Sequence, residues 1–386
     1  MKDNRVVGLD AKRIVRNGTG LGSYGRTLVN DLAAIDGLTL RLYAPDAGRD
    51  DLRGQVKESD RLCFCYPRGW QPLGKSYWRT RGMVSQLRRD GVQVYHGLSG
   101  ELPVGLGKAG IRSVVTIHDL IFMRHPEWYN AADVKIYTSK LHHAVAEADS
   151  IVAISECTRR DICELTDADP GKVTVVYQSC APRFTLDDIP DDDTMRLIWH
   201  VGDRYGIPDR YILSVGSIEE RKNMMLAVKA LHLLPQDIAL VVVGRYTPYA
   251  DSLWRYAEEN GLSERLVMLH DVPDDHLPPI YRRAEAFVYP SRYEGFGIPI
   301  IEAISMGLPV VACTGSCLEE AGGPHSIYVD PDDERAMAAA VASVLCGAEG
   351  REQRIEQSRQ YIQRFANNDA ARHIADIYLT LTNMQP

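Results

Sequence analysis

The chain has 386 residues, of which 45% are hydrophobic and 25% charged, and its formal net charge is −8 at pH 7. This length is too great for one ordinary core, so we expect two domains, and the composition is typical of a globular protein. The acidic balance argues against a general nucleic-acid binder. No apolar run reaches the roughly 20 residues of a membrane-spanning helix.

The eight cysteines and the N-terminal residues indicate in which cellular compartment to expect the protein. Cys63 lies close to Cys65, and Cys313 to Cys317, but neither pair has a second pair at the spacing of a zinc site. The N-terminal sequence MKDNRVVGLD lacks the apolar core of a signal peptide. We therefore expect reduced thiols and a cytoplasmic protein.

The first predicted strand, residues 5–10, leads into a glycine-rich loop and a helix over about 23–35. Three glycines of this loop have the G-x-G-x-x-G spacing of a dinucleotide site: Gly20, Gly22 and Gly25. About nine residues separate the strand from Gly20, whereas the turn of that motif follows its strand directly. A nicotinamide cofactor is therefore the weaker alternative for this loop.

Residues 66–89 form a basic segment with interleaved aromatic side chains, and no acidic residue follows until Asp90. Its aromatic and basic members are Trp70, Tyr77, Trp78, Arg68, Lys75, Arg79, Arg81, Arg88 and Arg89. Such a surface is suited to anionic lipid, with the aromatics at the headgroup level. The hypothesis is a peripheral contact with the inner face of a membrane, and the alternative is an ordinary solvated helix.

Two predicted strands of the first half bring a histidine to the carboxyl end of the sheet. The strand 92–96 ends in His96, and the strand 112–117 is followed by His118. Ligands of open α/β sheets bind outside these strand ends. A single histidine in such a place is also often structural, and both readings stay open here.

An acidic, proline-flanked stretch, residues 182–194, has little to bury and is the predicted linker. The chain then restarts the alternation of strands and helices, with strands expected at 211–215, 239–243 and 266–269. The acidic run 191–193 superficially offers a metal-binding pattern, but in a linker we interpret it as solvated. The last predicted helix carries an apolar stripe: Ile374, Ile377, Tyr378 and Leu381.

The most informative stretch is residues 284–313, AEAFVYPSRYEGFGIPIIEAISMGLPVVAC. It predicts a buried strand, a glycine-flanked loop, a helix over about 300–306 ended by Gly307, and a second strand. Glu294 lies in the loop and Glu302 in the expected first helical turn. The N–H groups of 295–298 and the helix dipole favour an anion there. The alternative is that Glu302 only complements the dipole and Glu294 faces water.

A second candidate phosphate site follows the strand 211–215, in the sequence GSIEERKN. Arg221 and Lys222 stand at the expected start of a helix over 223–233, where cations are unfavourable unless an anion compensates. Such a local conflict is typical of a binding site. Exposed basic residues in a loop are the alternative.

These motifs resemble the retaining glycosyltransferases of family 4. Y-E-G-F-G-I-P-x-x-E-A followed by G-L-P-V-V-A is similar to the donor-site signature of that family, and G-x4-R-K-N to its diphosphate clamp. The resemblance implies an α/β GT-B fold, with two Rossmann-like doubly wound domains facing each other across a cleft. The implied division is an acceptor-side domain 1–183, a linker 184–194, a donor domain 195–365, and a C-terminal helix 366–386 that packs back on the first domain.

The resemblance also implies roles for individual residues. Glu294 and His118 are the expected catalytic residues. The expected donor-binding residues are Arg221, Lys222, Glu302, Gly216, Ser217, Phe296, Gly297, Ile298, Val272, Gly20 and Gly22. Tyr24 and His96 are expected on the acceptor side. Many members have arginine where this chain has Ser217, which makes the role of Arg221 depend on its supplying the missing charge.

The segment His125–Tyr129 is most similar to bacterial members that build O-antigen and other surface polysaccharides, many of which use GDP-mannose. We therefore expect mannose transfer from GDP-mannose to a lipid-linked glycan, with retained configuration. Fixed cations would stabilise the leaving phosphate, so no metal or other cofactor is expected. The alternatives are a UDP-sugar-dependent transferase, a sugar-nucleotide epimerase, and a protein that binds a sugar nucleotide without turnover.

Overall fold

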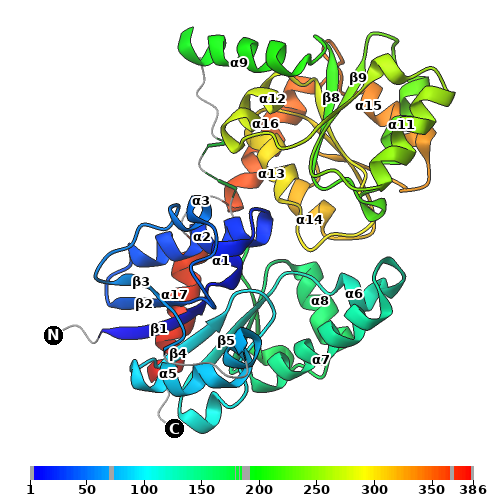
Figure 1. The fold of residues 1–386 in the computed structure, drawn as a ribbon. Helices are drawn as coiled ribbons and strands as arrows, with labels where there is room; N and C mark the ends of the chain where they lie inside the picture. The colour runs from blue at the N-terminus through cyan, green and yellow to red at the C-terminus, as the bar shows by residue number, and fades with distance from the viewer. Residues whose placement is uncertain are drawn as a thin grey trace. The chain divides into compact units, whose positions relative to one another are not determined.

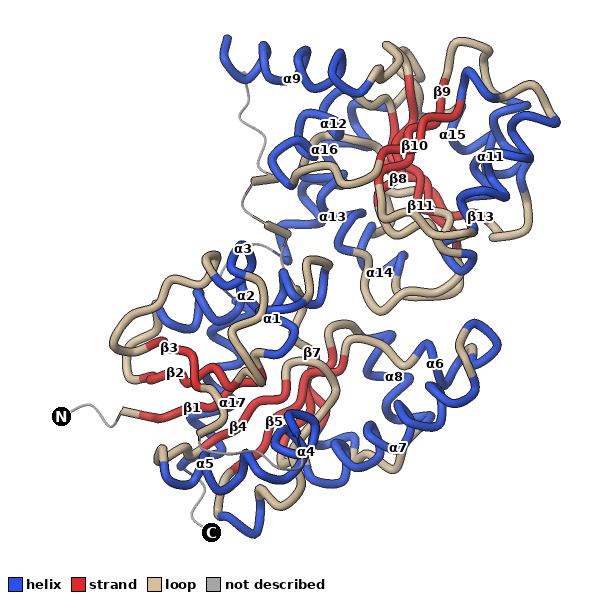
Figure 2. Tube along the Cα trace, in the orientation of Figure 1, coloured by secondary structure: helices blue, strands red, loops and turns tan. Residues whose placement is uncertain are grey.

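The computed structural model describes residues 4–68, 74–178, 180–181, 183–184, 192–365 and 369–383. The chain divides into two compact units. Unit 1 is Met1–Gln178 with Asn367–Pro386, and unit 2 is Ser179–Ala366. Each unit has one parallel sheet with helices on both faces (Figures 1 and 2), which confirms the predicted α/β class.

The sheet of unit 1 has the strand order β3-β2-β1-β4-β5-β6-β7, and all its pairings are parallel. This order, in which the chain moves outward from β1 to one side and then to the other, is that of a doubly wound Rossmann-like sheet. Its strands are β1 (Arg5–Asp10), β2 (Leu38–Tyr43), β3 (Leu62–Cys65), β4 (Val94–Gly97), β5 (Arg112–Ile117), β6 (Ser150–Ala153) and β7 (Val173–Val175).

The helices of unit 1 cover both faces of this sheet (Figure 2). They are α1 (Lys12–Arg16), α2 (Gly20–Ala33), α3 (Asp50–Arg53), α4 (Gly74–Tyr77), α5 (Met83–Arg89), α6 (Ile121–Arg124), α7 (Ala131–Glu147), α8 (Glu156–Leu165) and α17 (Asp369–Asn383). Alternate strand residues point to opposite faces, so two cores form. Leu9 and Val94 pack with α1, α2 and α17, while Tyr95 and Val115 pack with α5, α7 and α8.

The C-terminal helix α17 belongs to unit 1, although it follows unit 2 in the sequence. It packs against α2 (Figure 1). Ile374 and Tyr378 are fully buried, and Leu381 is nearly so, in the core that contains α2. These residues are spaced three or four apart, so they form one helical stripe. The apolar stripe seen in the sequence is therefore the face that α17 buries.

Helix α2 begins earlier than the sequence predicts, at Gly20 instead of residue 23. The side-chain oxygen of Asn17 accepts hydrogen bonds from the N–H groups of Thr19 at 2.8 Å and Gly22 at 3.3 Å, which holds the turn that starts the helix. A Cβ atom on Gly22 would lie 1.8 Å from the Asn17 carbonyl oxygen. The glycines of the predicted loop thus form the first turns of a helix, and Gly22 permits its close approach to the preceding backbone.

The sheet of unit 2 has the order β10-β9-β8-β11-β12-β13, again entirely parallel. Its strands are β8 (Tyr211–Val215), β9 (Ala239–Val243), β10 (Leu266–Leu269), β11 (Ala286–Tyr289), β12 (Val310–Cys313) and β13 (Ile327–Val329). Its helices are α9 (Asp192–Tyr205), α10 (Met224–Ala230), α11 (Tyr249–Glu259), α12 (Leu277–Arg283), α13 (Ile298–Ser305), α14 (Leu318–Gly322), α15 (Glu334–Ala342) and α16 (Arg351–Ile362).

Local predictions differ from the structure in detail. The expected helix 223–233 begins one residue later, as α10, because Asn223 has a left-handed backbone (φ 55°), and its last turn, Leu231–Leu233, is a 3-10 helix. The short edge strands β3 and β13 were not predicted, because three or four residues give too little periodicity to identify a strand. Of the predicted linker 182–194, residues 182 and 185–191 lie outside the described residues, and α9 already begins at Asp192.

Helix α9 packs against α12, and its Ile198 and Val201 are buried. Its Trp199 is half exposed, with the guanidinium carbon of Arg283 4.7 Å from the indole ring centroid. None of the described helices combines the length and the apolar character that crossing a membrane requires.

Candidate functional site

In unit 2 the strand order reverses at β8, which pairs with β9 on one side and β11 on the other. The connections after β8 and β11 leave in opposite directions, and ligands of open α/β sheets bind in the crevice that this creates. The segment 216–223 follows β8, and the segment 290–297 follows β11. The two stretches singled out in the sequence therefore meet at the topological switch point.

The connection after β11 is held rigidly before it enters α13. Gly297 caps that helix with φ 116°, a conformation that a side chain disfavours. The thiol of Cys317 donates to the carbonyl oxygens of Phe296 at 2.7 Å and Glu294 at 3.2 Å. Cys317 is the N-cap of α14, so the start of this helix holds the backbone around Glu294 in place.

Glu294 and Lys222 form a buried ion pair at this switch point. Their exposed fractions are 8% and 7%. The Lys222 ammonium also donates to the hydroxyl of Tyr289 at 2.8 Å, and that hydroxyl donates to Glu294 Oε1 at 3.3 Å. Three groups from three segments therefore form one closed network.

Both members of the pair stay charged. Burial alone would raise the pKa of Glu294, but Lys222 and then Arg221 lower it below its ordinary value. Burial alone would lower the pKa of Lys222, but Glu294 and Tyr289 raise it. The site thus holds a carboxylate and an ammonium at neutral pH, each stabilised by the other.

Arg221 adds a second cation on the other oxygen of the same carboxylate. Its Nη1 lies 3.3 Å from Glu294 Oε2, and its Nε lies 3.3 Å from Glu219 Oε2. Its carbonyl oxygen accepts from the Arg292 N–H at 3.0 Å, which ties the two connections together. The anion that compensates the adjacent cations in this structure is therefore the Glu294 side chain.

Gly216, directly after β8, lies beside this network. It has φ 151°, and a Cβ atom there would lie 3.8 Å from the Lys222 ammonium. Its carbonyl oxygen is so close to Gly244 that a Cβ atom on Gly244 would lie 1.8 Å from it. Ser217, next in the chain, is half-buried. A side chain at position 216 would thus be in van der Waals contact with the Lys222 ammonium.

Glu302 lies in the second turn of α13, not the first as predicted, because the helix begins two residues earlier at Ile298. Its Oε2 accepts a hydrogen bond from the Tyr281 hydroxyl at 3.0 Å. Burial raises the pKa of Glu302 to about 7, against the opposing effects of Tyr281 and Arg183. This carboxyl therefore changes its charge near neutral pH, unlike Glu294.

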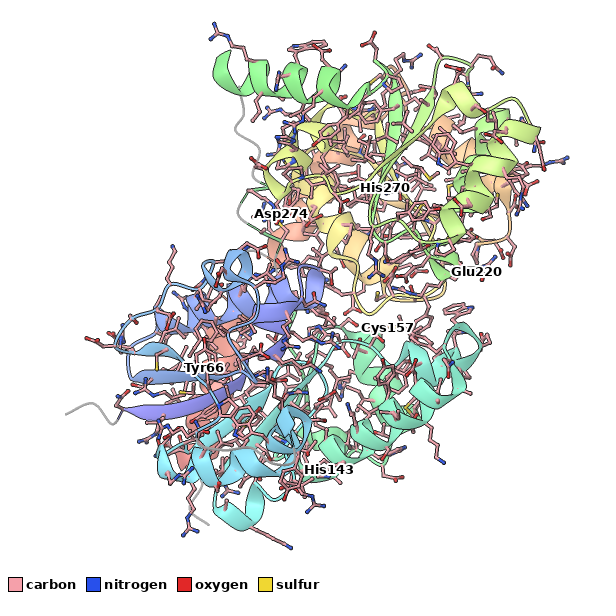
Figure 3. All side chains as sticks on the ribbon, viewed as in Figure 1. Tyr66, His143, Cys157, Glu220, His270 and Asp274 are labelled. Atoms are coloured by element: carbon pink, nitrogen blue, oxygen red, sulfur yellow. The ribbon has the colours of Figure 1, made fainter. Side chains whose placement is uncertain are left out.

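Three predicted donor residues differ in what they can offer a ligand. Phe296 is buried, and its ring meets Phe365 edge-on at 5.3 Å, so its side chain serves packing. Ile298 begins α13 and is half-buried, as is Val272 after β10. The connection with Val272 is anchored by His270 (Figure 3), whose Nδ1 lies 2.8 Å from the Gly244 carbonyl oxygen.

His118 follows β5 in unit 1, and both its ring nitrogens have partners. Nε2 lies 2.9 Å from the Leu98 carbonyl oxygen, and Nδ1 lies 3.1 Å from the side-chain amide nitrogen of Gln178. Burial lowers the pKa of His118 to about 4, so the ring is neutral. A carbonyl only accepts, which assigns the proton to Nε2. Tyr24 stands edge-on to this ring at 4.9 Å.

The other predicted residues of unit 1 are placed differently. Gly20 is exposed at the start of α2, whereas Gly22 is buried in the same turn. His96 is fully buried, with Nδ1 2.6 Å from the Tyr378 hydroxyl and Nε2 2.8 Å from the Thr116 hydroxyl. Both nitrogens of His96 thus join β4 to β5 and α17, an arrangement that favours the structural alternative for this histidine.

The basic segment 66–89 is not one continuous surface. Trp78 is buried in the core, and Arg79 forms ion pairs at 3.0 Å with Asp10 and with Glu101. Arg68 and Lys75 also form ion pairs, with Asp90 and Asp46. Arg81, Arg88 and Arg89 are exposed, and they form no ion pair with any of the described residues. Trp70 lies outside the described residues.

Two family models match the two halves of the chain. Residues 18–179 match the model described as Glycosyltransferase Family 4, and residues 204–361 match Glycosyl transferases group 1. The second range contains the whole Lys222–Glu294 network. The chain belongs to the glycosyltransferases.

Two curated proteins illustrate where this glycosyltransferase stands among its relatives. It is 29% identical over 344 residues to O-antigen chain mannosyltransferase B of Escherichia coli, a match that covers 85% of this chain and 87% of that protein. It is 28% identical over 263 residues to O-antigen chain mannosyltransferase RfbU of Salmonella typhimurium, covering 68% and 65%.

A solved structure supports the fold. The glycosyltransferase superposes with a TM-score of 0.74 on the HepE protein of Anabaena, whose crystal structure holds UDP and glucose. The sequences are 15% identical, and the match covers 98% of this chain and 100% of the other. The fold is therefore GT-B, built from two Rossmann-like units, as the sequence predicts.

Two tyrosines of the site were missed by the sequence analysis of this glycosyltransferase. Tyr289 ends β11 and bonds Lys222 and Glu294, while Tyr281 bonds Glu302. Phe287 stacks between them, with ring centroids 5.5 Å and 5.8 Å away. The available signal was that Tyr289 is the last residue of the predicted strand, where a side chain meets the crevice.

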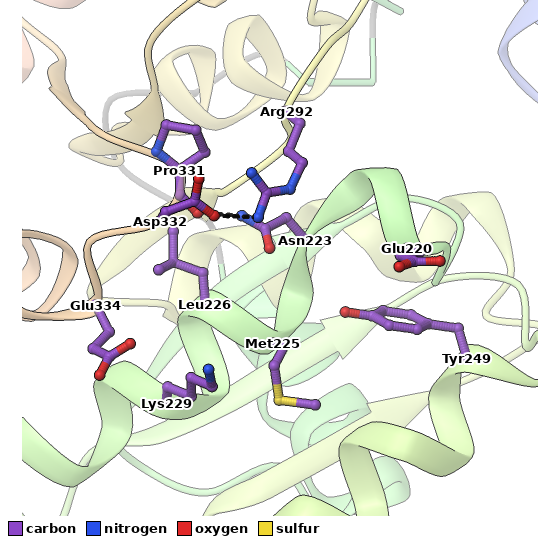
Figure 4. Close-up of a pocket in the computed structure, with 10 residues that line it drawn as sticks. All are labelled: Glu220, Asn223, Met225, Leu226, Lys229, Tyr249, Arg292, Pro331, Asp332 and Glu334. Atoms are coloured by element: carbon purple, nitrogen blue, oxygen red, sulfur yellow. Dashed lines mark hydrogen bonds and ion pairs between the residues drawn. The ribbon is translucent and has the colours of Figure 1, made fainter. Parts of the chain in front are cut away.

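A cavity of about 320 Å³ lies beside the same two connections of this glycosyltransferase (Figure 4). Its lining mixes cations, carboxylates and apolar side chains: Glu220, Asn223, Met225, Leu226, Lys229, Tyr249, Arg292, Pro331, Asp332 and Glu334. Arg292 and Asp332 pair with each other across it (Figure 4). Neither Lys222 nor Glu294 lines this cavity, so it is separate from the network at the switch point.

Proposed function

We propose that this glycosyltransferase moves mannose from GDP-mannose onto a lipid-linked glycan, with retained anomeric configuration, in the synthesis of O-antigen or a related surface polysaccharide. The network of Lys222, Arg221 and Glu294 at the switch point of unit 2 carries the transferase assignment. The names of the two curated relatives support mannose and the O-antigen setting.

The leaving diphosphate defines what the cations must do. When the bond from the anomeric carbon to the phosphate breaks, negative charge grows on the phosphate oxygens, and preorganised cations stabilise it. An ammonium has three N–H donors, and Tyr289 and Glu294 take two of those of Lys222. In the proposal the third donates to a phosphate oxygen beside Gly216, where any other residue would place a side chain against the ammonium. Arg221 supplies the second positive charge.

Glu294 has the complementary task. Positive charge grows at the anomeric carbon while the phosphate leaves, and a nearby carboxylate stabilises it. Because the cations hold the pKa of Glu294 below its ordinary value, it is ionised at the working pH. In the proposal its oxygens also orient the sugar hydroxyls. Lys222 thus serves both the leaving group and the carboxylate beside it.

Glu302 and the connection after β10 serve the nucleoside. A carboxylate accepts hydrogen bonds from both ribose hydroxyls, which suits Glu302 at the same helix as the phosphate site. The backbone near Val272 would contact the base. In unit 1, His118 would contact the transferred sugar through its neutral ring. Since fixed cations neutralise the phosphate, the proposal requires no metal ion.

Retention is proposed to occur by front-side attack. A double displacement requires a carboxylate nucleophile beneath the sugar ring. Glu294 is already held by Lys222 and Arg221, which reduces its nucleophilicity. The acceptor hydroxyl then attacks from the face that the phosphate leaves, and its proton passes to the departing phosphate oxygen.

The test is a calorimetric panel of donors without added metal: GDP-mannose, UDP-glucose, UDP-N-acetylglucosamine and ADP-glucose. We expect GDP-mannose to bind selectively and to bind more weakly to Lys222→Ala. The matched control is Lys229→Ala, which removes a lysine of the adjacent helix that lies outside the network. Binding of GDP-mannose that is unchanged in Lys222→Ala would contradict the site.

A UDP-sugar is the second candidate donor, because the HepE structure of the same fold holds UDP and glucose. The same panel separates the two. If UDP-glucose binds more tightly than GDP-mannose and its binding weakens in Lys222→Ala, the site assignment stands but the donor is not GDP-mannose. Formation of an epimer without acceptor would instead indicate a sugar-nucleotide epimerase.

A further inference from the structure

The cavity of about 320 Å³ in unit 2 is built from the same two connections as the donor network, but from different side chains. Glu220 and Asn223 line the cavity, whereas Lys222, which lies between them in sequence, belongs to the network. Arg292 lines the cavity, whereas Glu294, two residues further on, belongs to the network. The connections after β8 and β11 therefore present side chains to two separate spaces.

Contacts between segments that are distant in sequence hold the walls of this cavity. The side-chain amide of Asn223 donates to the Pro331 carbonyl oxygen at 2.8 Å, and Asn223 is buried. The Arg292 guanidinium pairs with Asp332 (Figure 4), and the Arg292 N–H donates to the Arg221 carbonyl oxygen at 3.0 Å. The connections after β8 and β11 are thus tied to each other and to the segment before α15, as in a preformed ligand site.

The lining combines hydrogen-bonding groups with apolar surface. Glu220 and Glu334 are exposed, and neither forms an ion pair within the described part of the chain. Tyr249 is half-buried, and its hydroxyl is directed toward the middle of the lining residues (Figure 4). Apolar surface is added by Met225 and Leu226. A sugar ring matches such a lining, because its hydroxyls both donate and accept while its C–H groups are apolar.

The charges of the lining argue against other classes of ligand. Asp332 is already paired with Arg292, which leaves the carboxylates of Glu220 and Glu334 against the single ammonium of Lys229. This excess of one negative charge repels a phosphate. Among the residues that the structure describes, no group of histidine, cysteine and carboxylate side chains is arranged to hold a metal ion. Small-ligand sites range over about 300–1,000 Å³, so a cavity of this size suits about one or two sugar rings.

We propose that this cavity is a second sugar-binding site, which holds a neutral sugar residue of a glycan chain outside the donor site. The chain belongs to the glycosyltransferases, whose reaction involves such residues. The inference rests on that membership and not on the proposed choice of donor. Because Glu220 and Glu334 are exposed, the cavity opens to solvent, and a residue within a longer glycan can enter it. A glycan held there stays bound to the enzyme while the spent nucleotide leaves.

The binding experiment titrates the full chain with two neutral probes, methyl α-mannoside and methyl α-glucoside, and measures their Kd by saturation-transfer NMR. We expect the wild type to bind at least one of them. Glu334→Gln and Tyr249→Ala should each weaken that binding about fivefold or more, because the sugar loses a charged acceptor or the aromatic wall. Since Glu334 is exposed, Glu334→Gln should fold normally and gives the comparison by itself if Tyr249→Ala folds poorly.

Each variant has a matched control. Glu352 is exposed in the first turn of α16, as Glu334 is in the first turn of α15, so Glu352→Gln removes the same charge from an equivalent position. Tyr246 is 47% exposed, lies three residues before Tyr249 and does not line the cavity, so Tyr246→Ala removes a neighbouring tyrosine. Both controls should bind the probes like wild type.

Two further probes test the class of ligand. Mannose 6-phosphate should bind more weakly than the neutral glycosides, because the lining repels its negative charge. Mannotriose should bind at least as tightly as methyl α-mannoside, because a residue of a chain can enter the open cavity. The proposal is overturned if neither glycoside binds the wild type, if the variants bind like their controls, or if the phosphorylated sugar binds more tightly. Weaker binding of mannotriose would overturn the assignment to a glycan chain.

Failure of the proposed function gives a different result, because these titrations contain no nucleotide. If the donor panel favours a UDP-sugar, or if no donor binds, the assignment of the donor is wrong. Sugar binding that still depends on Glu334 and Tyr249 in that case supports the second site by itself.

Discussion

Lys222 and Glu294 lie 72 residues apart in sequence and form a buried ion pair at the carboxyl edge of the unit 2 sheet. The same two residues are proposed to stabilise opposite charges of one reaction. Isolated buried charges are costly, and each cancels the cost of the other. In the proposal the pair therefore links folding to catalysis, because changing either residue alone removes the main charge partner of the other.

The first prediction concerns stability. Lys222→Met should lower the free energy of unfolding by about 3–5 kcal/mol, because it leaves the Glu294 carboxylate buried without its main partner. Adding Glu294→Gln should restore most of this loss, since the remaining amide carries no charge. Urea denaturation of the three proteins measures both effects. Lys229→Met is the control, and a loss in it equal to that in Lys222→Met would contradict the explanation.

The second prediction concerns Tyr289, whose hydroxyl joins Lys222 to Glu294. Tyr289→Phe should lower kcat about tenfold with little change in donor Kd, because the carboxylate loses a group that orients it. Tyr211→Phe is the matched control: it also loses a buried hydroxyl bond, to the Ile280 carbonyl oxygen at 2.6 Å, but away from the network. Equal kinetic losses in both variants would show that general packing, not positioning, is responsible.

The third prediction follows from the pKa of Glu302, raised to about 7 by burial. GDP-mannose has no phosphate group that titrates near this pH. If Glu302 binds the ribose, its ionisation therefore dominates the pH dependence of donor affinity. Donor affinity should rise from pH 6 to pH 8 as Glu302 ionises and accepts hydrogen bonds. Glu302→Gln should bind weakly with a flat profile. Calorimetry at each pH checks this, and a flat wild-type profile would remove Glu302 from the ribose site.

The same shift has a consequence for stability. The pKa of Glu302 in the folded state lies above its ordinary value of 4.5. The stabilising contribution of Glu302 to the free energy of unfolding is therefore fully present below pH 4.5 and is lost as pH rises through about 7. Relative to Glu302→Gln, the wild type should therefore become less stable between about pH 4.5 and 7. Thermal melts of both proteins across this range supply the measurement.

The fourth prediction concerns membrane contact through the basic segment. Arg79 belongs to an internal ion-pair network, so a variant that includes it would confuse unfolding with lost binding. The informative variant is Arg81→Glu/Arg88→Glu/Arg89→Glu, because these side chains are exposed. Wild type should sediment with anionic liposomes, and this variant should do so less. Equal sedimentation would show that this segment is an ordinary solvated surface.

The sequence located the candidate residues of unit 2 more closely than those of unit 1, for a physical reason. Around Glu294 a strand, a loop and a helix follow one another, so the position of the carboxylate at a strand end could be inferred from local patterning. Its pairing with Lys222 could not, because that depends on β8 and β11 being neighbours in the sheet. The order of the strands in the sheet decides which charged side chains become neighbours.

The basic segment and His96 show the same limit. Periodicity places Arg79 on a helix but does not show that it reaches Asp10 across 69 residues of sequence. A histidine at a strand end can face the crevice or the core, and the residue that decides it for His96 is Tyr378, 282 positions away. Local pattern gives the element, whereas tertiary contacts determine what its polar side chains do.

The last prediction separates the structural from the acceptor role of His96. Burial lowers the pKa of His96 to about 3, so the neutral ring donates from one nitrogen and accepts at the other. Tyr378→Phe should lower the free energy of unfolding by about 1–3 kcal/mol, because it leaves Nδ1 of His96 buried without a partner. Because both nitrogens serve the interior, KM for the acceptor should not change in this variant. A raised acceptor KM at unchanged stability would instead return His96 to the acceptor site.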